Sequence, residues 1–425
     1  MSTAASRSGE RYDCIVIGGG PAGATAGALL AEYGHRTLIL EKDRFPRHHI
    51  GESLMPATYW TFRRLGVLER LKTSNFPRKE SVQFVSETGR DSAPYFFTDR
   101  DPGEWSVTWQ VRRDEFDALM LDNAREKGAE VRSGVAVDRV LMDAGRAVGV
   151  LAADSGARRE IHAQAIVDAS GQSAILANQL DLRRGDAKLR NAAIYGYFRG
   201  AKRDEGRNAG ATIILNLPQR AGWFWFIPLP DDLASIGVVA PPAYLTNNRG
   251  GDPSRTLAEE IEKCPGMRDR LADAEQIGPT RVCRDFSYLV DRMGGDGWVL
   301  AGDALGFLDP VYSSGVMLAL KSGEFAADAI HEGLERGDLS ERQLRKYEPQ
   351  FRRAVALLKN LVYAFYDRSF SFGAFLKAHP EHRDNLVRLL IGDVFNDEVG
   401  KIFGPMSQWT RLPEPIESPR GGASR

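Results

Sequence analysis

The sequence predicts a mixed α/β protein, and three patterns along its 425 residues carry that prediction. Near the N-terminus, a glycine-rich turn separates an apolar strand from a helix of small residues. In residues 185–280, apolar and polar residues alternate, as in NAAIYGYF and ATIILNL, which is typical of an antiparallel sheet. From residue 336 onward, apolar residues recur at helical spacing. We therefore expect a strand–helix–strand domain, a second sheet domain and a C-terminal helical segment.

Composition and charge are those of an ordinary globular protein, with 43% hydrophobic and 27% charged residues and a net charge of −1. A nearly neutral chain gives no electrostatic reason to expect nucleic acid or an anionic membrane as a partner. No apolar run approaches the roughly 18 residues that cross a bilayer, and the N-terminus lacks the apolar centre of a signal peptide. Cys14, Cys264 and Cys283 have no metal-like spacing. We expect a cytoplasmic protein with reduced thiols and no metal.

The glycine-rich turn lies in residues 12–41, YDCIVIGGGPAGATAGALLAEYGHRTLILE. Its G-x-G-x-x-G motif contains Gly18, Gly20 and Gly23, with Ala22 inside it. The first glycine allows a tight turn, the second lets the backbone approach a pyrophosphate, and the third lets the helix pack on the strand. Helix N-terminal amides favour phosphates, and Glu41 is placed to accept hydrogen bonds from ribose hydroxyls. Strand, helix and acid are in register, which favours dinucleotide binding over a plain packing turn.

A second motif, WVLAGDALGFLDP in residues 298–310, decides between NAD and FAD. A strand ends at Gly302 and Asp303, and the following residues 304–306 are expected to open a helix. An aspartate in this place can bind the ribityl chain of FAD, while the N-terminus of the next helix faces the pyrimidine side of the ring. Together with the N-terminal motif, this pattern resembles the FAD-binding half of the flavoprotein monooxygenase superfamily.

Two more segments resemble that superfamily. Residues 109–131, WQVRRDEFDALMLDNAREKGAEV, match its segment in which an arginine contacts the flavin and a helix follows. That arginine falls on Arg113; Gln110 is a weaker candidate, and a surface salt bridge is the alternative role for Arg113. Asp168, which begins DASG, matches the turn near the adenosine. The resemblance implies a Rossmann-like FAD-binding domain of the glutathione reductase/p-hydroxybenzoate hydroxylase type, with an antiparallel-sheet substrate domain.

The aromatic stretch GWFWFIPLP, residues 222–230, narrows the resemblance. Trp223 and Trp225 begin a W-x-W-x-I-P pattern, the signature of flavin-dependent halogenases. Residues 307–315, FLDPVYSSG, resemble the halide loop of that family, and NFPRK, residues 75–79, resembles the segment with its essential lysine, which falls on Lys79. The resemblance covers roughly residues 10 to 400. It is closest to the branch that halogenates phenols and carrier-tethered pyrroles.

The resemblance implies that reduced FAD (FADH2) reacts with O2 to a C4a-hydroperoxide, which chloride or bromide attacks to give hypohalous acid. The backbone amides of Ser314 and Gly315 are expected to hold the halide, with a plain helix cap as the alternative. Lys79 is expected to guide the hypohalous acid to the substrate. Ser81 stands where the family has a glycine two residues after this lysine. A solvated charge therefore stays open as the alternative for Lys79, and Lys72 is the second candidate.

The two tryptophans should point to one face of a strand. The resemblance puts Trp223 and Trp225 near the flavin and near the tunnel through which hypohalous acid travels to the substrate. There they would exclude an organic substrate from the flavin. The alternative interpretation is that both are large residues of the core. Tyr312 stands where the tryptophan-halogenating branch has a glutamate. A phenol or pyrrole, which is already electron-rich, is therefore the expected substrate rather than free tryptophan.

We expect a discontinuous FAD-binding domain of residues 1–180 plus 280–335, with residues 80–105 contributing to the substrate domain of residues 185–280. Residues 336–412 form the C-terminal helical region, for which a lid over the substrate and a dimer face both remain open. The Pro/Gly/Ser-rich residues 413–425 are expected to be disordered.

The predicted function is an FADH2- and O2-dependent halogenase of secondary metabolism, such as antibiotic biosynthesis. We expect a separate NAD(P)H-dependent flavin reductase as partner, a free or carrier-tethered aromatic substrate, and a monomer or homodimer. An FAD-dependent hydroxylase or a prenyl-type reductase of the same fold is the alternative function. A flavin-binding protein without catalytic activity is the third.

Overall fold

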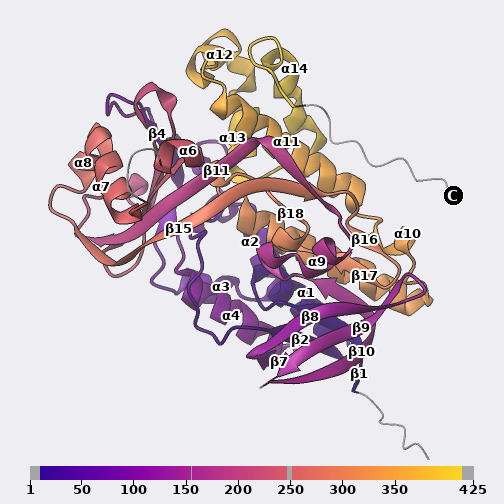
Figure 1. Cartoon of the computed structure of the whole chain (residues 1–425). Coiled ribbons are helices and arrows are strands. Elements are labelled where there is room, and N and C mark those ends of the chain that lie inside the picture. The colour runs from indigo at the N-terminus through magenta and orange to yellow at the C-terminus, as the bar shows by residue number, and fades with distance from the viewer. Residues whose placement is uncertain (1–9, 155, 247–250, 414–425) are drawn as a thin grey trace, which may run out of the picture.

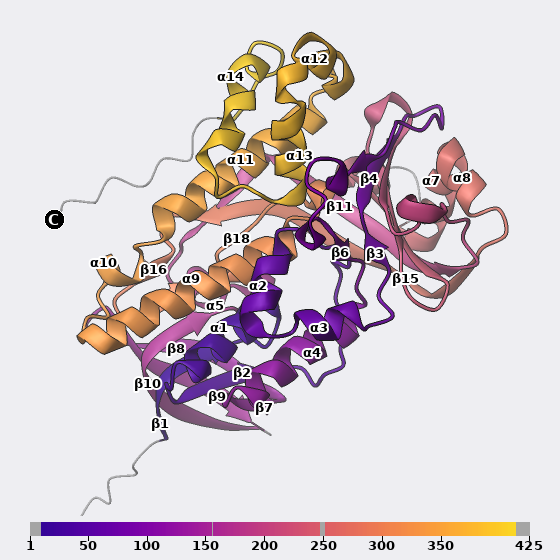
Figure 2. The same ribbon diagram turned by 180° about the vertical axis from the view of Figure 1, so that it is seen from behind.

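The computed structural model describes residues 10–154, 156–246 and 251–413, and the tail predicted to be disordered lies almost entirely outside them. The molecule has two large sheets, and the long strands β11 (Arg183–Arg199) and β15 (Glu275–Val290) of the second sheet run across the molecule in Figure 1. Helices of the C-terminal segment lie above them, and Figure 2 shows the same arrangement from behind. The mixed α/β class is confirmed.

The first sheet has the order β16-β17-β10-β1-β2-β7. Its strands are β16 (Gly294–Gly295), β17 (Trp298–Leu300), β10 (Ala157–Asp168), β1 (Arg11–Ile17), β2 (Thr37–Glu41) and β7 (Glu130–Ser133). From β17 to β7 neighbouring strands are parallel, so their carboxyl ends meet at one edge, where ligands of such sheets bind. A hairpin of β8 (Val135–Asp143) and β9 (Arg146–Asp154) extends β10.

Helices α1 (Pro21–Glu32), α4 (Arg113–Glu126) and α9 (Gly315–Arg336) pack together beside this sheet. Helix α1 is buried along most of its length because its small residues let it lie directly on the strands. Shorter helices connect the elements: α2 (Thr58–Leu65), α3 (Leu68–Lys72) and α5 (Ile175–Gln179). Strand β3 (Arg78–Lys79) follows α3 in the chain and pairs with β6 (Thr108–Trp109) in a two-stranded ribbon. Strand β3 contains Lys79, one of the predicted site residues.

The second sheet has the order β18-β15-β11-β14-β13-β12-β4-β5. Besides β11 and β15, it contains β18 (Gly306–Phe307), β14 (Leu233–Ala240), β13 (Trp223–Pro228), β12 (Thr212–Asn216), β4 (Ser81–Val85) and β5 (Tyr95–Phe96). All pairs are antiparallel except β12 with β4. Three helices that sequence analysis did not predict interrupt it: α6 (Pro242–Thr246), α7 (Pro253–Lys263) and α8 (Pro265–Arg270). Each begins with a proline, which fits the first helical position.

Strand β13 separates two hydrophobic cores. Trp223 and Trp225 point into the main core of the molecule, whereas Phe224 and Phe226 point into a smaller core with α7 and α8. All six residues of the strand are buried. The prediction that both indoles point to one face of a strand is confirmed, and that face is turned toward the first sheet and the C-terminal helices.

The C-terminal segment is helical, as predicted. It contains α10 (Glu341–Leu344), α11 (Glu348–Tyr366), α12 (Phe372–Ala378), α13 (Arg383–Ile391) and α14 (Phe403–Met406). The end of α11 packs on the second sheet, where Phe365 contacts Trp223 at a centroid distance of 6.2 Å. None of the helices in the described part of the chain is long and apolar enough to cross a membrane.

The segment after β17 differs from the prediction that residues 304–306 open a helix. A single 3-10 turn, Gly302–Ala304, is followed by β18, which pairs with Tyr288 and Leu289 of β15. Asp309 then caps a second 3-10 turn, Pro310–Tyr312, and the long helix α9 begins only at Gly315. Pairing with the edge of the second sheet keeps the chain extended. The first α-helix after Asp303 is therefore α9, and its N-terminus lies at the end of the predicted halide loop.

Candidate active site

The glycine motif forms a cradle at the N-terminus of α1. Gly18 has a φ of 97°, and a Cβ there would lie 2.4 Å from the Ala169 carbonyl oxygen. A Cβ on Gly23 would lie 1.9 Å from the Gly18 oxygen, so both positions require glycine. At Gly20 the nearest atom to an added Cβ is Nη2 of Arg47, at 3.5 Å. No side chain caps the helix, so space and helix N-terminal amides are present where a pyrophosphate of FAD fits.

Glu41 is buried, and its carboxylate holds the turn together by accepting from the amides of Gly19 at 2.6 Å and Asp43 at 2.8 Å. Arg47 stands beside the cradle, 3.2 Å from Asp117, and sequence analysis missed it. Its guanidinium is a cation suited to a phosphate group. The basic run RFPRHH after Glu41 was the available signal.

The second FAD motif adjoins the first. Gly302 has a φ of 61°, and a Cβ there would lie 2.9 Å from Cβ of Ala22 in α1. Burial raises the pKa of Asp303 to about 6, although Arg113 opposes the shift. Asp168 is buried and accepts from the amides of Ser170 at 3.0 Å and Leu176 at 2.7 Å, so its carboxylate shapes the turn after β10.

Arg113 is buried, not part of a surface salt bridge. Its Nε and Nη2 donate to both carboxylate oxygens of Asp117 at 2.8 and 2.9 Å, and Nη1 donates to the Ile50 carbonyl at 2.7 Å. The bidentate pair lies within α4, whereas the bonds of Nη1 to the carbonyls of Ile50 and Gly51, the latter at 3.3 Å, fasten this helix to the start of residues 51–54, GESL. The weaker candidate, Gln110, donates to the Gly210 carbonyl and to Thr212, both at 2.9 Å, while its side-chain oxygen is buried without a hydrogen-bond partner.

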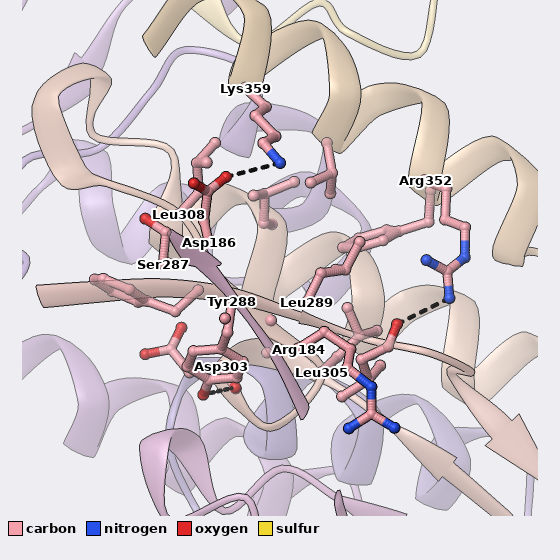
Figure 3. Close-up of a pocket in the computed structure, with 18 of the residues that line it drawn as sticks. Arg184, Asp186, Ser287, Tyr288, Leu289, Asp303, Leu305, Leu308, Arg352 and Lys359 are labelled. Carbon is pink, nitrogen blue, oxygen red and sulfur yellow. Dashed lines mark hydrogen bonds and ion pairs between the residues drawn. The ribbon is translucent and has the colours of Figure 1, made fainter. Parts of the chain in front are cut away.

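A cavity of about 370 Å³ lies between β11, β15, the loop after β17, α9 and α11. Figure 3 shows residues that line it. Three predicted residues line it, namely Gly302, Asp303 and Gly315. Its walls are largely apolar, and at the end far from Asp303, Asp186 and Lys359 form an ion pair of 2.8 Å. The cavity thus connects the predicted flavin-binding motif with the predicted halide loop.

The halide loop ends in a turn that exposes backbone amides. Ser313 has a left-handed φ of 59°, Ser314 is the N-cap of α9, and no side chain caps this helix. First-turn amides have no partner within their own helix, and the positive end of the helix dipole lies there. A Cβ on Gly315 would meet no atom within 4 Å. The geometry suits an anion held by the amides of Ser314 and Gly315.

Lys79 is 3% exposed, which does not fit a solvated charge. Its Nζ donates to Ser53 Oγ at 2.8 Å and to the Leu54 carbonyl at 2.9 Å, and no carboxylate of the described residues forms an ion pair with it. This burial lowers the pKa of Lys79 to about 7. Lys72, by contrast, lies at the surface in ion pairs with Glu69 and Glu104.

The two indoles are held by hydrogen bonds that sequence analysis did not foresee. Trp223 Nε1 donates to the Tyr366 hydroxyl at 2.8 Å, and Trp225 Nε1 donates to Ser235 Oγ at 3.0 Å. The ring centroids lie 6.2 Å apart.

We expect the change Gly20→Val to yield folded, colourless protein. The protein itself leaves room for the new side chain, but that room is where the pyrophosphate fits. The FAD content of purified protein, read from the absorbance ratio of flavin to protein, measures the effect. Gly404→Val is the control, because a Cβ on Gly404 meets no atom within 4 Å and Gly404 lies outside the glycine motif. A Gly20→Val protein with full FAD content would show that the phosphate site is misplaced.

Lys79 should make stability depend on pH. Its pKa is lowered to about 7 from 10.5, so between these values the unfolded chain binds more protons than the folded one, and stability rises with pH. Lys79→Met removes this dependence. Its stability relative to wild type should therefore fall by about 3 kcal/mol between pH 6 and pH 9 in urea unfolding. Lys72→Met should show no such trend, and a pH-independent difference for Lys79→Met would contradict the burial of the amine.

Comparison with known proteins agrees with this geometry. Residues 11–359 match the model of the FAD binding domain family. A pyrrole-2-carbonyl peptidyl-carrier-protein chlorinase of Pseudomonas fluorescens is 31% identical over 93% of this chain and 92% of its own length. The corresponding brominase of Pseudoalteromonas luteoviolacea is 33% identical over 92% and 94%. The solved structure of a flavin-dependent brominase superposes with a TM-score of 0.85 at 30% identity, covering 94% of this chain and 99% of the other. The chain belongs to the flavin-dependent halogenases, enzymes that use FAD with halide and O2.

Proposed function

We propose that this halogenase transfers chlorine or bromine to an electron-rich aromatic ring, with a pyrrole tethered to a carrier protein as the first candidate substrate and a phenol as the second. The relatives that act on carrier-tethered pyrrole match over more than nine tenths of this chain, which supports the first candidate. Tyr312, in place of a carboxylate, supports a ring that loses its proton easily. We further propose a separate NAD(P)H-dependent flavin reductase as partner and a cytoplasmic location.

The observation that carries the proposal is the buried amine of Lys79. Bound FAD, once reduced, supplies with O2 the oxidising power that converts halide to hypohalous acid. With a pKa of about 7, a large fraction of Lys79 is neutral at neutral pH. A neutral amine has two N–H groups, and Ser53 Oγ and the Leu54 carbonyl accept both. The nitrogen lone pair then points away from both acceptors.

This amine is suited to carry the halogen. Attack of the Nζ lone pair on hypohalous acid forms an N–halogen bond and releases water. Attack of the aromatic ring on that halogen restores the amine, and the ring then loses a proton. The amides of Ser314 and Gly315 would hold the halide before its oxidation, and Trp223 and Trp225 would keep the organic substrate away from the flavin.

An assay with a flavin reductase, NaCl or NaBr and O2 tests the substrate. Pyrrole-2-carbonyl on a carrier protein, free pyrrole-2-carboxylate and a set of phenols are compared by mass spectrometry. We expect halogenated pyrrole on the carrier and little reaction with the free acid. Hydroxylated product without halogen would instead favour the monooxygenase alternative.

Lys79→Met should keep the FAD content and the consumption of O2 while product formation falls by about 10³-fold, since the amine acts after the halide is oxidised. Methionine preserves most of the side-chain volume, so the fold is retained. Lys79→Arg should not restore activity, because a guanidinium does not lose its proton near pH 7. The control Lys72→Ala removes an exposed lysine seven residues away and should leave the rate unchanged. Product formation by Lys79→Met at the wild-type rate would exclude this role.

A further inference from the structure

The indole N–H groups of Trp223 and Trp225 in β13 each donate a hydrogen bond to a hydroxyl, and that hydroxyl is itself hydrogen-bonded to a buried carboxylate. For Trp223, the hydroxyl is that of Tyr366, which donates to Asp309 Oδ2 at 2.7 Å. For Trp225, it is that of Ser235, which lies 3.5 Å from Glu52 Oε2. Burial raises the pKa of Asp309 and that of Glu52, and their hydrogen bonds oppose the shift. We call these the Trp223 relay and the Trp225 relay.

The Trp223 relay ends in the halide loop. Asp309 caps the turn before Ser314 by accepting from the Val311 amide at 3.1 Å, and its own amide donates to Ser287 at 2.9 Å. The carboxylate therefore shapes the segment that leads into the anion-binding turn. Tyr366 is the last residue of α11, and its bond to Asp309 lets this helix hold the halide loop in place.

The Tyr366 hydroxyl is a junction of the relay. It donates to Asp309 and accepts from Trp223 Nε1 and from Asn191 Nδ2, the latter at 3.0 Å. Asn191 also reaches Asp309 Oδ2 at 3.0 Å. Trp223 is 2% exposed, so its N–H has no access to water when this hydroxyl is absent. Such a loss strands a buried donor and removes a bond to a carboxylate.

The Trp225 relay ends at the lysine. Glu52 accepts a second bond from the Tyr197 hydroxyl at 2.7 Å, which holds the carboxylate in place. The next two residues, Ser53 and Leu54, supply the acceptors of the Lys79 amine. The orientation of one indole is thus tied to the halide loop and that of the other to the lysine.

We propose that Tyr366 and Ser235 are positioning residues, which hold the halide loop and the lysine end of the tunnel in register with the two tryptophans. The inference rests on the proposed function of those two ends. It predicts that the two relays affect different steps: the Trp223 relay affects halide binding, and the Trp225 relay affects the transfer of hypohalous acid after halide oxidation.

The test compares Tyr366→Phe with Tyr363→Phe. Tyr363 lies three residues earlier on the same helix, and its hydroxyl also contacts a carboxylate, that of Asp186 at 2.9 Å, outside both relays. With saturating substrate, Tyr366→Phe should raise the KM for halide by about tenfold and leave FAD content unchanged, because the change loosens only the halide loop. Tyr363→Phe should keep the wild-type KM. Equal KM values in Tyr366→Phe and Tyr363→Phe would overturn the role of Tyr366.

Ser235→Ala addresses the other relay. It should keep the halide KM and raise the share of hypohalous acid that escapes, captured by a thioether in solution and compared with halogenated product. An unchanged share would overturn the role of Ser235, and a raised halide KM would overturn the division between the two relays.

A measurement independent of turnover separates this inference from the proposed function. In protein labelled with ¹⁵N at the indole nitrogens, the Trp223 and Trp225 signals are assigned by Trp→Phe variants. Tyr366→Phe should speed hydrogen exchange of the Trp223 signal alone, and Ser235→Ala that of the Trp225 signal alone. Unaltered exchange would overturn the relays. If the wild type halogenates no substrate but the two variants still show faster indole hydrogen exchange, the proposed function fails and the relays remain as structural hydrogen bonds.

Discussion

The burial of the Lys79 amine without an opposing carboxylate is the constraint on which the site depends. An ammonium group in this place loses hydration that no ion pair among the described residues replaces, and the pKa of Lys79 falls to about 7. The folded state tolerates this loss of hydration because Ser53 Oγ and the Leu54 carbonyl accept hydrogen bonds from the amine. Those acceptors lie in residues 51–54, which Arg113 anchors through the Ile50 and Gly51 carbonyls, while the bidentate pair with Asp117 in the same helix fixes the guanidinium. The arginine predicted to contact the flavin thus supports the segment that holds the lysine.

The parts of the site that the sequence predicts are those where one residue type answers a local backbone need. Gly18 and Gly23 are required by contacts of 2.4 and 1.9 Å, and the alternation in β13 places both tryptophans on one face. The helix expected at residues 304–306 is wrong because the partner of β18 lies in β15, which is distant in sequence. Local propensity carries no information about such pairing.

The hydrogen-bonded relays were beyond sequence analysis for a related reason. Tyr366 and Trp223 are separated by 143 positions, and Ser235 and Glu52 by 183. Each residue alone is an ordinary tyrosine, serine or glutamate, and only the packing of α11 and β14 on β13 turns them into partners. Burial has the same effect on Lys79, whose sequence neighbours Arg78 and Glu80 suggest a solvated cluster.

The insertion of β18 between Asp303 and α9 has a chemical consequence. A helix that began at residues 304–306 would direct its N-terminal amides at the place next to Asp303, the aspartate predicted to bind the ribityl chain. Instead, the chain makes a detour along β15, and the positive end of a 22-residue helix appears at Ser314 and Gly315. The unpaired amides of the helix N-terminus therefore lie at the predicted halide loop and not beside the predicted flavin-binding motif. Because Asp303 and Gly315 both line the same cavity, the predicted flavin-binding motif and the predicted halide loop open into one space across this displacement.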